Sequence, residues 1–197
     1  MRIGVLGGSF DPPHRGHLEL AKAAIDQLEL EEVIVVPAHR NPLKVTKGAT
    51  SPKHRLAMVE RMIAAEPSMA CSDMEITRGG PSYTVDTLNE LQMVRPAEYW
   101  FIMGADALRG LASWKSPARL VKLCRLAVAI RPPLIVADAM VRLPEEYKGK
   151  VDVVKMASLE ISSSEIRDRL HNGQNVTPWV SPEVLQYIHT HKLYRDA

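Results

Sequence analysis

The chain has few of the residues that mark secreted, fibrous or membrane proteins. It contains 2 cysteines, 11 glycines and 14 prolines in 197 residues. So few cysteines argue against a disulfide scaffold, and the modest glycine and proline content excludes a collagen-like or low-complexity chain. No apolar run approaches the ~20 residues needed to cross a bilayer. The apolar stretch after Met1 is also too short for a signal peptide, so we expect a protein without a membrane partner.

Charge and composition favour an ordinary globular enzyme over a dedicated nucleic-acid binder. The formal net charge is only +2, which leaves room for a local cationic site but not for a nucleic-acid surface. Cys71 and Cys124 have apolar neighbours and are predicted to be buried, reduced thiols, which fits a cytoplasmic location. We expect a single domain over residues 1–197, with a C-terminal helical portion from about residue 158.

Hydrophobic spacing alternates between short buried runs and helical periods along the whole chain. Strands are expected over 3–6, 33–36, 69–76, 99–103, 126–130 and 151–154. Helices are expected over 15–28, 84–92, 117–123 and 162–170, between Pro52 and Pro67, and from Ser181 onward. Ser51 and Ser181 each precede a first-turn proline, as at capped helix starts. Residues 38–50 are predicted to form a long loop, and 132–150 an irregular segment.

This alternation predicts an α/β fold with a doubly wound, mostly parallel sheet in three layers, α/β/α. In such sheets the ligand lies beyond the carboxyl ends of the strands. The rule selects four segments: 7–17, 37–44, 104–106 and the loop before Ser162.

The strongest motif is Gly7-Gly8-Ser9-Phe10-Asp11-Pro12-Pro13-His14-Arg15-Gly16-His17, between the first strand and the first helix. The glycines allow a tight turn, and the helix start offers N–H groups to a phosphate. The Gly-x-Gly-x-x-Gly and Walker A patterns are absent. The second strand ends at Pro37, without the acidic residue that binds a dinucleotide ribose, so an oxidoreductase is disfavoured.

Two histidines in this motif, His14 and His17, stand three residues apart at a helix start and can face one side. A zinc site would need a third protein ligand, and none stands nearby at ligand spacing. A purely structural pair is the second alternative. We favour phosphate contact because the pair follows a Gly-Gly strand exit.

A second motif, Ile161-Ser162-Ser163-Ser164-Glu165-Ile166-Arg167, opens the helix near the C-terminus. Ser162 and Glu165 match a capping box, so a well-capped helix is the simpler interpretation. That interpretation leaves three consecutive hydroxyls and Arg167 without a role. Hydroxyls, helix N–H groups and a guanidinium together suit a polyphosphate.

These two motifs resemble those of the nucleotidyltransferase superfamily with the His-x-Gly-His loop, and within it the bacterial nicotinate mononucleotide adenylyltransferases. The similarity extends to Ser82-Tyr83-Thr84, Gly104-Ala105-Asp106 and Trp114. It departs at Asn41-Pro42-Leu43-Lys44, where the family usually has Pro-Pro-His-Lys, although Lys44 is kept. The resemblance implies a Rossmann-like fold and transfer of AMP from ATP to nicotinate mononucleotide, giving deamido-NAD and pyrophosphate, with Mg²⁺.

The resemblance also implies a role for each matching residue. His14, His17 and Arg167 would be catalytic, and no residue would be a metal ligand. The ATP-binding residues would be Gly7, Gly8, Ser9, Phe10, His14, His17, Gly104, Asp106, Ile161, Ser162, Ser163, Ser164 and Arg167. The mononucleotide-binding residues would be Ser9, Lys44, Tyr83, Thr84, Trp114 and Arg131.

Three alternatives stay open at this point. One is another member of the superfamily, such as a pantetheine-phosphate adenylyltransferase or a cytidylyltransferase. Another is a transferase that prefers nicotinamide mononucleotide, and the third is a non-catalytic nucleotide-binding regulator. His54, Arg55, His189 and His191 are interpreted as surface or capping groups. A homo-oligomer is a possible assembly.

Overall fold

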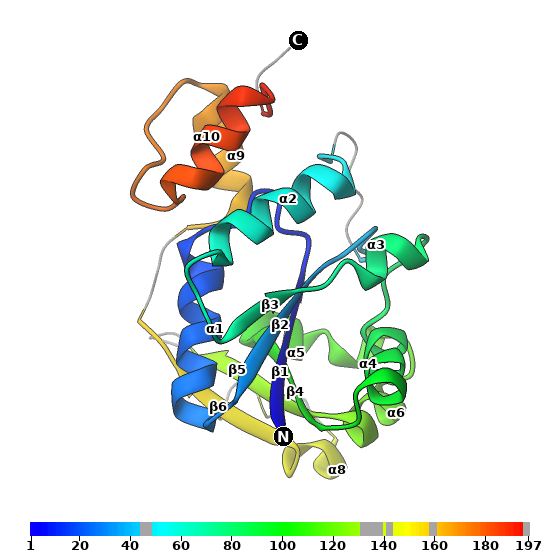
Figure 1. The fold of residues 1–197 in the computed structure, drawn as a ribbon. Coiled ribbons are helices and arrows are strands. Elements are labelled where there is room, and N and C mark those ends of the chain that lie inside the picture. The colour runs from blue at the N-terminus through cyan, green and yellow to red at the C-terminus, as the bar shows by residue number, and fades with distance from the viewer. Residues whose placement is uncertain (44–48, 131–139, 141–143, 158–160, 195–197) are drawn as a thin grey trace.

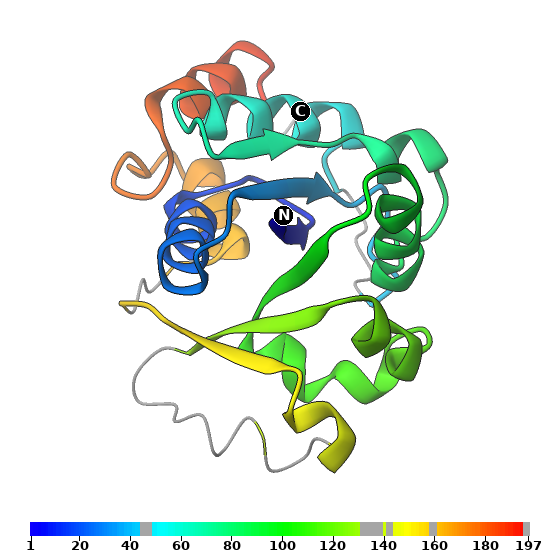
Figure 2. The same cartoon turned by 60° about the horizontal axis from the view of Figure 1, so that its bottom comes forward.

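The computed structural model describes residues 1–43, 49–130, 140, 144–157 and 161–194. Its centre is a six-stranded parallel sheet in the order β3-β2-β1-β4-β5-β6 (Figures 1 and 2). The strands are β1 (Arg2–Gly8), β2 (Glu32–Pro37), β3 (Met69–Cys71), β4 (Glu98–Gly104), β5 (Arg125–Ile130) and β6 (Val151–Lys155). The predicted α/β class and doubly wound sheet are confirmed, and the order changes direction at β1, between β2 and β4.

Helices cover both faces of this sheet, as Figure 2 shows. They are α1 (Arg15–Leu28), α2 (Pro52–Ile63), α3 (Met74–Arg78), α4 (Thr84–Val94), α5 (Ala105–Arg109), α6 (Pro117–Leu123), α8 (Glu145–Lys148), α9 (Ser163–His171) and α10 (Pro182–Thr190), with a 3₁₀ turn η1 (Leu111–Ser113). In the described part of the chain, none of these helices is long and apolar enough to cross a membrane.

The strands bury side chains on both faces, which is why their sequences are continuously apolar. On β4, Trp100 and Ile102 pack with α1, α2, α9 and α10. Phe101, like the other β4 residues that point to the opposite face, packs with α4, α5 and α6. Figure 1 shows α9 and α10 at the end of the molecule where β1 leads into α1. This end carries the carboxyl edge of the sheet.

Two helix starts follow the capping chemistry expected from the sequence. The Ser51 hydroxyl accepts a hydrogen bond from the His54 backbone N–H at 3.4 Å, and Ser181 does the same for Val184 at 3.4 Å. A proline follows each serine in the first turn. The rigid ring fits this position because its missing N–H has no intrahelical partner to lose.

The expected strand over 69–76 is wrong in its second half. The strand ends at Cys71, and Met74–Arg78 forms the short helix α3. The Asp73 carboxylate accepts a hydrogen bond from the Thr77 hydroxyl at 3.0 Å, and Glu75 is buried against Thr87 of α4. Tertiary contacts of polar side chains therefore outweigh the strand-like pattern.

Two further expectations need correction. The segment 132–150, expected to be irregular, contains the helix α8. Cys124 is buried as predicted, but Cys71 is only half-buried. For both thiols burial is the main cause that raises the pKa to about 12, so neither forms appreciable thiolate at neutral pH.

A charged cluster ties together the three strands β4, β5 and β6. The Asp152 carboxylate accepts hydrogen bonds from Trp100 Nε1 and Arg125 Nη2, both at 2.8 Å. The Arg125 hydrogen bond is the main cause that lowers the pKa of Asp152. Because the folded carboxylate is stabilised, Asp152 contributes stability above its unfolded pKa and loses that contribution as pH falls through its folded pKa.

We expect Asp152→Asn to lower the free energy of unfolding by about 1–2 kcal/mol at pH 7, because a charged acceptor of three hydrogen bonds, two from Arg125 and one from Trp100, is lost. The difference from the wild type should begin to shrink as the pH falls below the ordinary aspartate pKa, and it should close only below the lowered pKa of folded Asp152. Urea unfolding across this pH range measures it. Asp26→Asn, at an exposed site on α1, is the control and should change stability by less than about 0.5 kcal/mol. A pH-independent deficit would contradict the account.

Candidate active site

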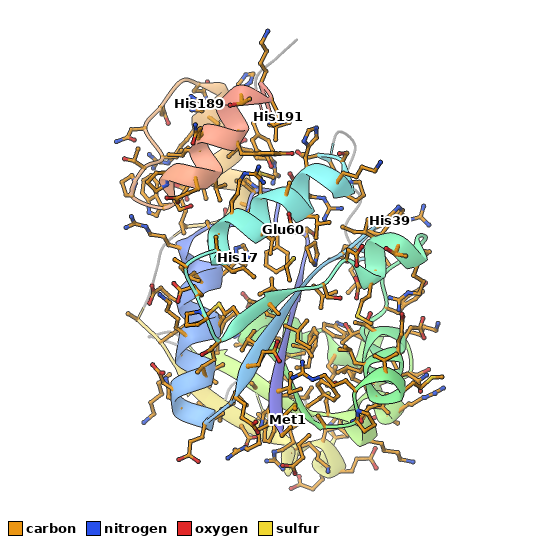
Figure 3. The ribbon with its side chains drawn as sticks, viewed as in Figure 1. Met1, His17, His39, Glu60, His189 and His191 are labelled. Atoms are coloured by element: carbon orange, nitrogen blue, oxygen red, sulfur yellow. The ribbon has the colours of Figure 1, made fainter. Side chains whose placement is uncertain are left out.

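The segments that follow β1, β2 and β4 and the start of α9 gather at the carboxyl edge of the sheet. The backbone of Ala38, after β2, donates to the Gly8 carbonyl at the end of β1 at 2.8 Å. In Figure 3, His17 lies at the end of α1 that faces α2, and His39 lies near α3. This edge is where a doubly wound sheet binds its ligand.

The histidine pair forms the start of α1. His14 is the N-cap and is buried, and its ring lies 3.8 Å from that of His17. The His14 backbone N–H donates to His17 Nδ1 at 3.2 Å. A nitrogen that accepts a hydrogen bond carries no proton, so in the neutral ring the proton of His17 is on Nε2. His17 therefore has a defined donor, Nε2–H, at a helix N-terminus.

Gly16 leaves room for this packing. A Cβ at Gly16 would lie 3.0 Å from the His14 ring, tighter than ordinary van der Waals contact. Glycine thus allows the imidazole to lie close to the backbone of the first helical turn. The spacing His14-Arg15-Gly16-His17 has a steric reason as well as a chemical one.

The second motif is bound directly to the first. Arg167 Nη1 donates to the Asp11 carbonyl at 2.7 Å, and the Ser163 hydroxyl donates to the Pro12 carbonyl at 2.9 Å. Arg167 Nη2 also donates to Ser164 Oγ at 3.2 Å. The two bonds from Arg167 use two of its five guanidinium N–H donors. The planar group can therefore hold the loop and still present donors to an anion.

The start of α9 carries the predicted cap in part. Ser162 Oγ accepts a hydrogen bond from the Glu165 backbone at 3.1 Å. The Glu165 carboxylate, however, pairs with Arg169 at 2.9 Å, so the return half of the predicted capping box is replaced by an ion pair. The exposed Ser162 and Ser164 hydroxyls stand beside the first N–H groups of the helix.

On the other side of the edge, α4 begins next to an aromatic pair. Tyr83 is the N-cap of α4 without a side-chain cap, and Thr84 is the first helical residue. Trp114 is half-buried and meets Phe101 edge-on, with ring centroids 5.7 Å apart. Lys115 Nζ lies 4.5 Å from the centroid of the Tyr83 ring. An uncapped helix start and a half-exposed indole can contact an anionic, flat group.

The exit of β4 contributes Gly104 and Asp106. Gly104 is the N-cap of α5, and apart from its chain neighbours no described residue has an atom within 4 Å of the position that a Cβ would take. The Asp106 side chain is 89% exposed and pairs with Arg109 at 2.9 Å. Asp106 is thus open to a ligand and does not cap the helix.

The other predicted site residues differ in what they can offer. The side chains of Phe10 and Ile161 are buried in the core, so only their backbone can face a ligand. Gly7, Gly8 and Ser9 lie at the end of β1 and just after it. Lys44 and Arg131 lie outside the described residues.

Three buried or half-buried residues at this edge were missed as site residues. Arg55, interpreted from the sequence as a surface or capping group, is only 4% exposed. Asp11 accepts hydrogen bonds from the Tyr194 hydroxyl at 2.6 Å and from the Thr50 backbone at 3.3 Å. Burial is the main cause that raises the pKa of Tyr194, with Asp11 adding to it. Arg55, Asp11 and Tyr194 are far apart along the chain, so no local sequence pattern indicates that they come together at this edge.

These residues do not form a metal cage. Among the described residues, there is no group of three or more His, Cys, Asp or Glu side chains that could hold a metal ion. The carboxylate of Asp11, in the motif after β1, accepts hydrogen bonds from Tyr194 and Thr50. A hard cation at this edge would therefore need most of its oxygen ligands from a substrate or water.

A family model described as cytidylyltransferase-like matches residues 5–169. The chain therefore belongs to the cytidylyltransferase-like family, as the two motifs predicted.

Curated relatives define the group more narrowly. Over 99% of this chain, 39% of residues are identical to a Synechococcus protein named "Probable nicotinate-nucleotide adenylyltransferase", of which 95% is covered. A protein of the same name from Geotalea daltonii is 38% identical, with both chains fully covered. The resemblance stated from the sequence is confirmed by these relatives.

Solved structures support the fold. Plasmodium falciparum nicotinic acid mononucleotide adenylyltransferase, complexed with NaAD, superposes with a TM-score of 0.81 at 23% identity. The match covers 98% of this chain and 97% of that one. Its complex with APC gives a TM-score of 0.78 at 22% identity, covering 98% and 96% of the two chains.

We expect Arg167→Lys to weaken ATP binding about tenfold or more in calorimetry, because an ammonium group cannot hold the Asp11 carbonyl and an anion with one planar fork. The matched control is Arg169→Lys on the same helix, where Arg169 pairs with Glu165 and lies over Trp179. The control should bind ATP as the wild type does. Unchanged affinity in Arg167→Lys would make Arg167 a purely structural residue.

Proposed function

We propose that the protein transfers the adenylyl group of ATP to nicotinate mononucleotide, forming deamido-NAD and pyrophosphate in NAD biosynthesis. The observation that carries this proposal is that hydrogen bonds join the Ser162–Arg167 helix start to the loop that leads directly into the His14–His17 helix start. Two helix N-termini and a guanidinium at one edge suit a triphosphate. The two relatives named as probable nicotinate-nucleotide adenylyltransferases support the choice of nicotinate mononucleotide as acceptor.

ATP would occupy the side of the edge formed by β1, β4 and α9. His14 and His17 would contact its phosphates, with His17 nearest the α-phosphate. Arg167 and the serines at 162–164 would hold the β- and γ-phosphates, and Gly104 and Asp106 would contact ribose or adenine. The loop over 7–10 would contribute its backbone.

The mononucleotide would occupy the side formed by the start of α4. Trp114 would stack on the pyridine ring, and Thr84 with the N–H groups after Tyr83 would receive the carboxylate. Ser9 would stand between the two substrates. Lys44 and Arg131 remain sequence-based candidates for the same nucleotide.

The reaction needs no protein nucleophile, because the acceptor's 5′-phosphate is already an anion. One of its oxygens would attack the α-phosphorus in line, and the bond from that phosphorus to the β-phosphate bridging oxygen would break. Pyrophosphate then leaves with the electron pair, and no covalent enzyme intermediate forms. The protein's work is to position two anions and to stabilise the charge that develops.

His17 is suited to this work by its tautomer. Its Nδ1 accepts a hydrogen bond from the His14 backbone N–H, so Nε2–H is the donor that would contact a phosphate oxygen. The backbone bond also fixes the orientation of the ring. A preorganised donor of this kind stabilises developing charge without rearranging during the reaction.

Magnesium is expected to arrive with ATP. Because the described residues offer no three-carboxylate or histidine cluster, Mg²⁺ would be held mainly by phosphate oxygens and water. When bound, the ion would supply neutralisation of phosphate charge. The partners are thus small molecules, and we expect the reaction to take place in the cytoplasm.

Substitutions at His17 distinguish the roles of its two ring nitrogens. His17→Ala and His17→Asn should each lower turnover by a factor of about 10²–10³, because both remove the Nε2–H donor. Asn keeps an acceptor near the position of Nδ1 and should preserve the helix start. Gln places an amide N–H near the position of Nε2, so His17→Gln should lose less turnover than Asn. Steady-state pyrophosphate release measures all three.

The control for the His17 series is thermal unfolding of the same variants. His17→Asn should unfold close to the wild type. Wild-type turnover in a folded His17→Ala protein would contradict the assignment, and so would equal losses in Asn and Gln.

The choice of pyridine follows from the donors at the start of α4. A carboxylate satisfies N–H donors, whereas an amide turns one N–H toward them and leaves a donor unpaired, at a cost of ~1–3 kcal/mol. We therefore expect nicotinate mononucleotide to be preferred over nicotinamide mononucleotide by about ten- to hundredfold in kcat/KM. Competition between the two mononucleotides measures the ratio. Equal or reversed preference would contradict the carboxylate subsite.

Trp114→Ala belongs to the same experiment. Stacking does not distinguish acid from amide, so this variant should weaken both mononucleotides similarly and leave their ratio unchanged. Trp179→Ala is the matched control, since Trp179 packs against Arg169 on the other face of the sheet. A change of the ratio in Trp114→Ala would show that the indole reads the substituent.

A further inference from the structure

Arg55 joins three segments of the carboxyl edge. Its Nη1 donates to the Ser9 carbonyl at 2.6 Å, its Nη2 to the His39 carbonyl at 2.9 Å, and its Nε to the Thr50 carbonyl at 3.0 Å. The side chain comes from the first turns of α2 and is 4% exposed. A buried guanidinium with each nitrogen donating to a different segment is a rigid spacer.

The second of these segments continues to the start of α4. The His39 backbone N–H donates to Ser82 Oγ at 2.9 Å, and His39 Nδ1 lies 2.9 Å from the Gly80 carbonyl. The Ser82 backbone donates in turn to the Arg40 carbonyl at 2.8 Å. A continuous set of hydrogen bonds therefore runs from Ser9, through Arg55 and His39, to the turn just before Thr84.

Buried charge near Arg55 is balanced by Asp11. Burial is the main cause that lowers the pKa of Arg55, and the Asp11 carboxylate opposes this shift. Asp11 is itself fixed by the Tyr194 hydroxyl and the Thr50 backbone. The same aspartate offers its carbonyl to Arg167. The guanidinium of Arg55 is thereby anchored to the phosphate loop on one side and to the start of α4 on the other.

We infer that Arg55 is a positioning residue that sets the separation between the ATP phosphates and the pyridine end of the mononucleotide. This inference rests on the proposed function, because it needs ATP at the β1 loop and the mononucleotide at α4. Arg55 would touch neither substrate. It would hold the two subsites at the spacing at which the 5′-phosphate meets the α-phosphorus in line.

The physical consequence concerns ligands that span both subsites. The affinity of a ligand that occupies only one subsite does not depend on the distance between the two subsites. The dinucleotide product occupies both at once, and its affinity depends on the match between its length and theirs. The transition state is more demanding still, since a misplacement of about 1 Å can lower the rate about 10²-fold.

The test compares three ligands on two variants. Arg55→Lys keeps a cation opposite Asp11 but cannot make the three planar contacts. Ser82→Ala leaves Arg55 in place and removes one hydrogen bond at the other end of the connection, from the His39 backbone to Ser82 Oγ, in case the lysine variant does not fold. Calorimetry would give the dissociation constants of ATP, nicotinate mononucleotide and deamido-NAD, and steady-state kinetics would give kcat.

In Arg55→Lys we expect ATP and the mononucleotide to bind within about threefold of the wild type, while deamido-NAD weakens at least about tenfold and kcat falls about 10²-fold. Ser82→Ala should change the same quantities in the same direction, with deamido-NAD weakened about threefold or more. Arg61→Lys is the matched control on α2, where Arg61 lies over Tyr187. It should leave all three affinities and kcat unchanged.

The inference is overturned if the folded variants weaken all three ligands equally, or if deamido-NAD binds as tightly as before. Either result would make Arg55 a residue of stability alone. Failure of the proposed function has a different signature. In that case the wild-type protein itself would bind no deamido-NAD and release no pyrophosphate from ATP with nicotinate mononucleotide.

Discussion

Two hydrogen bonds, from Arg167 to the Asp11 carbonyl and from Ser163 to the Pro12 carbonyl, join the start of α9 to the loop after β1. The two partners are more than 150 residues apart in the sequence. Each bond uses a side chain of the Ile161–Arg167 motif, so the C-terminal part of the chain completes this edge of the sheet. Without them only the N-terminus of α1, and not that of α9, would lie beside the loop after β1.

The parallel sheet makes this union possible because it brings the carboxyl ends of distant strands to one edge. On that edge, the β1 and α9 segments form a cationic, donor-rich side, and α4 with Trp114 forms an aromatic side. Arg55 lies between the two sides with each of its guanidinium nitrogens bonded to a backbone carbonyl. In the proposed mechanism, substrate binding and substrate spacing therefore depend on different residues.

Sequence reasoning predicted the parallel sheet and its longer helices, and it selected the two motifs that meet at the carboxyl edge, because hydrophobic period, capping serines and glycine turns are local signals. It failed at α3, where Glu75 is buried against Thr87 of a later helix. It also missed Arg55, since a single arginine in a helix resembles a surface residue until the three carbonyls around it are known. The chemistry of a motif can be read locally, whereas a buried polar network depends on contacts made by folding.

The central claim is that two anions react directly on a scaffold that supplies no nucleophile. Quenched-flow measurement of pyrophosphate release, with enzyme comparable in concentration to ATP, tests it most directly. The account predicts no pyrophosphate from ATP alone and rapid release once nicotinate mononucleotide is added, with adenylate appearing only in the dinucleotide. A burst of pyrophosphate equal to the enzyme concentration before any acceptor is present would show a covalent adenylyl-enzyme and contradict the account.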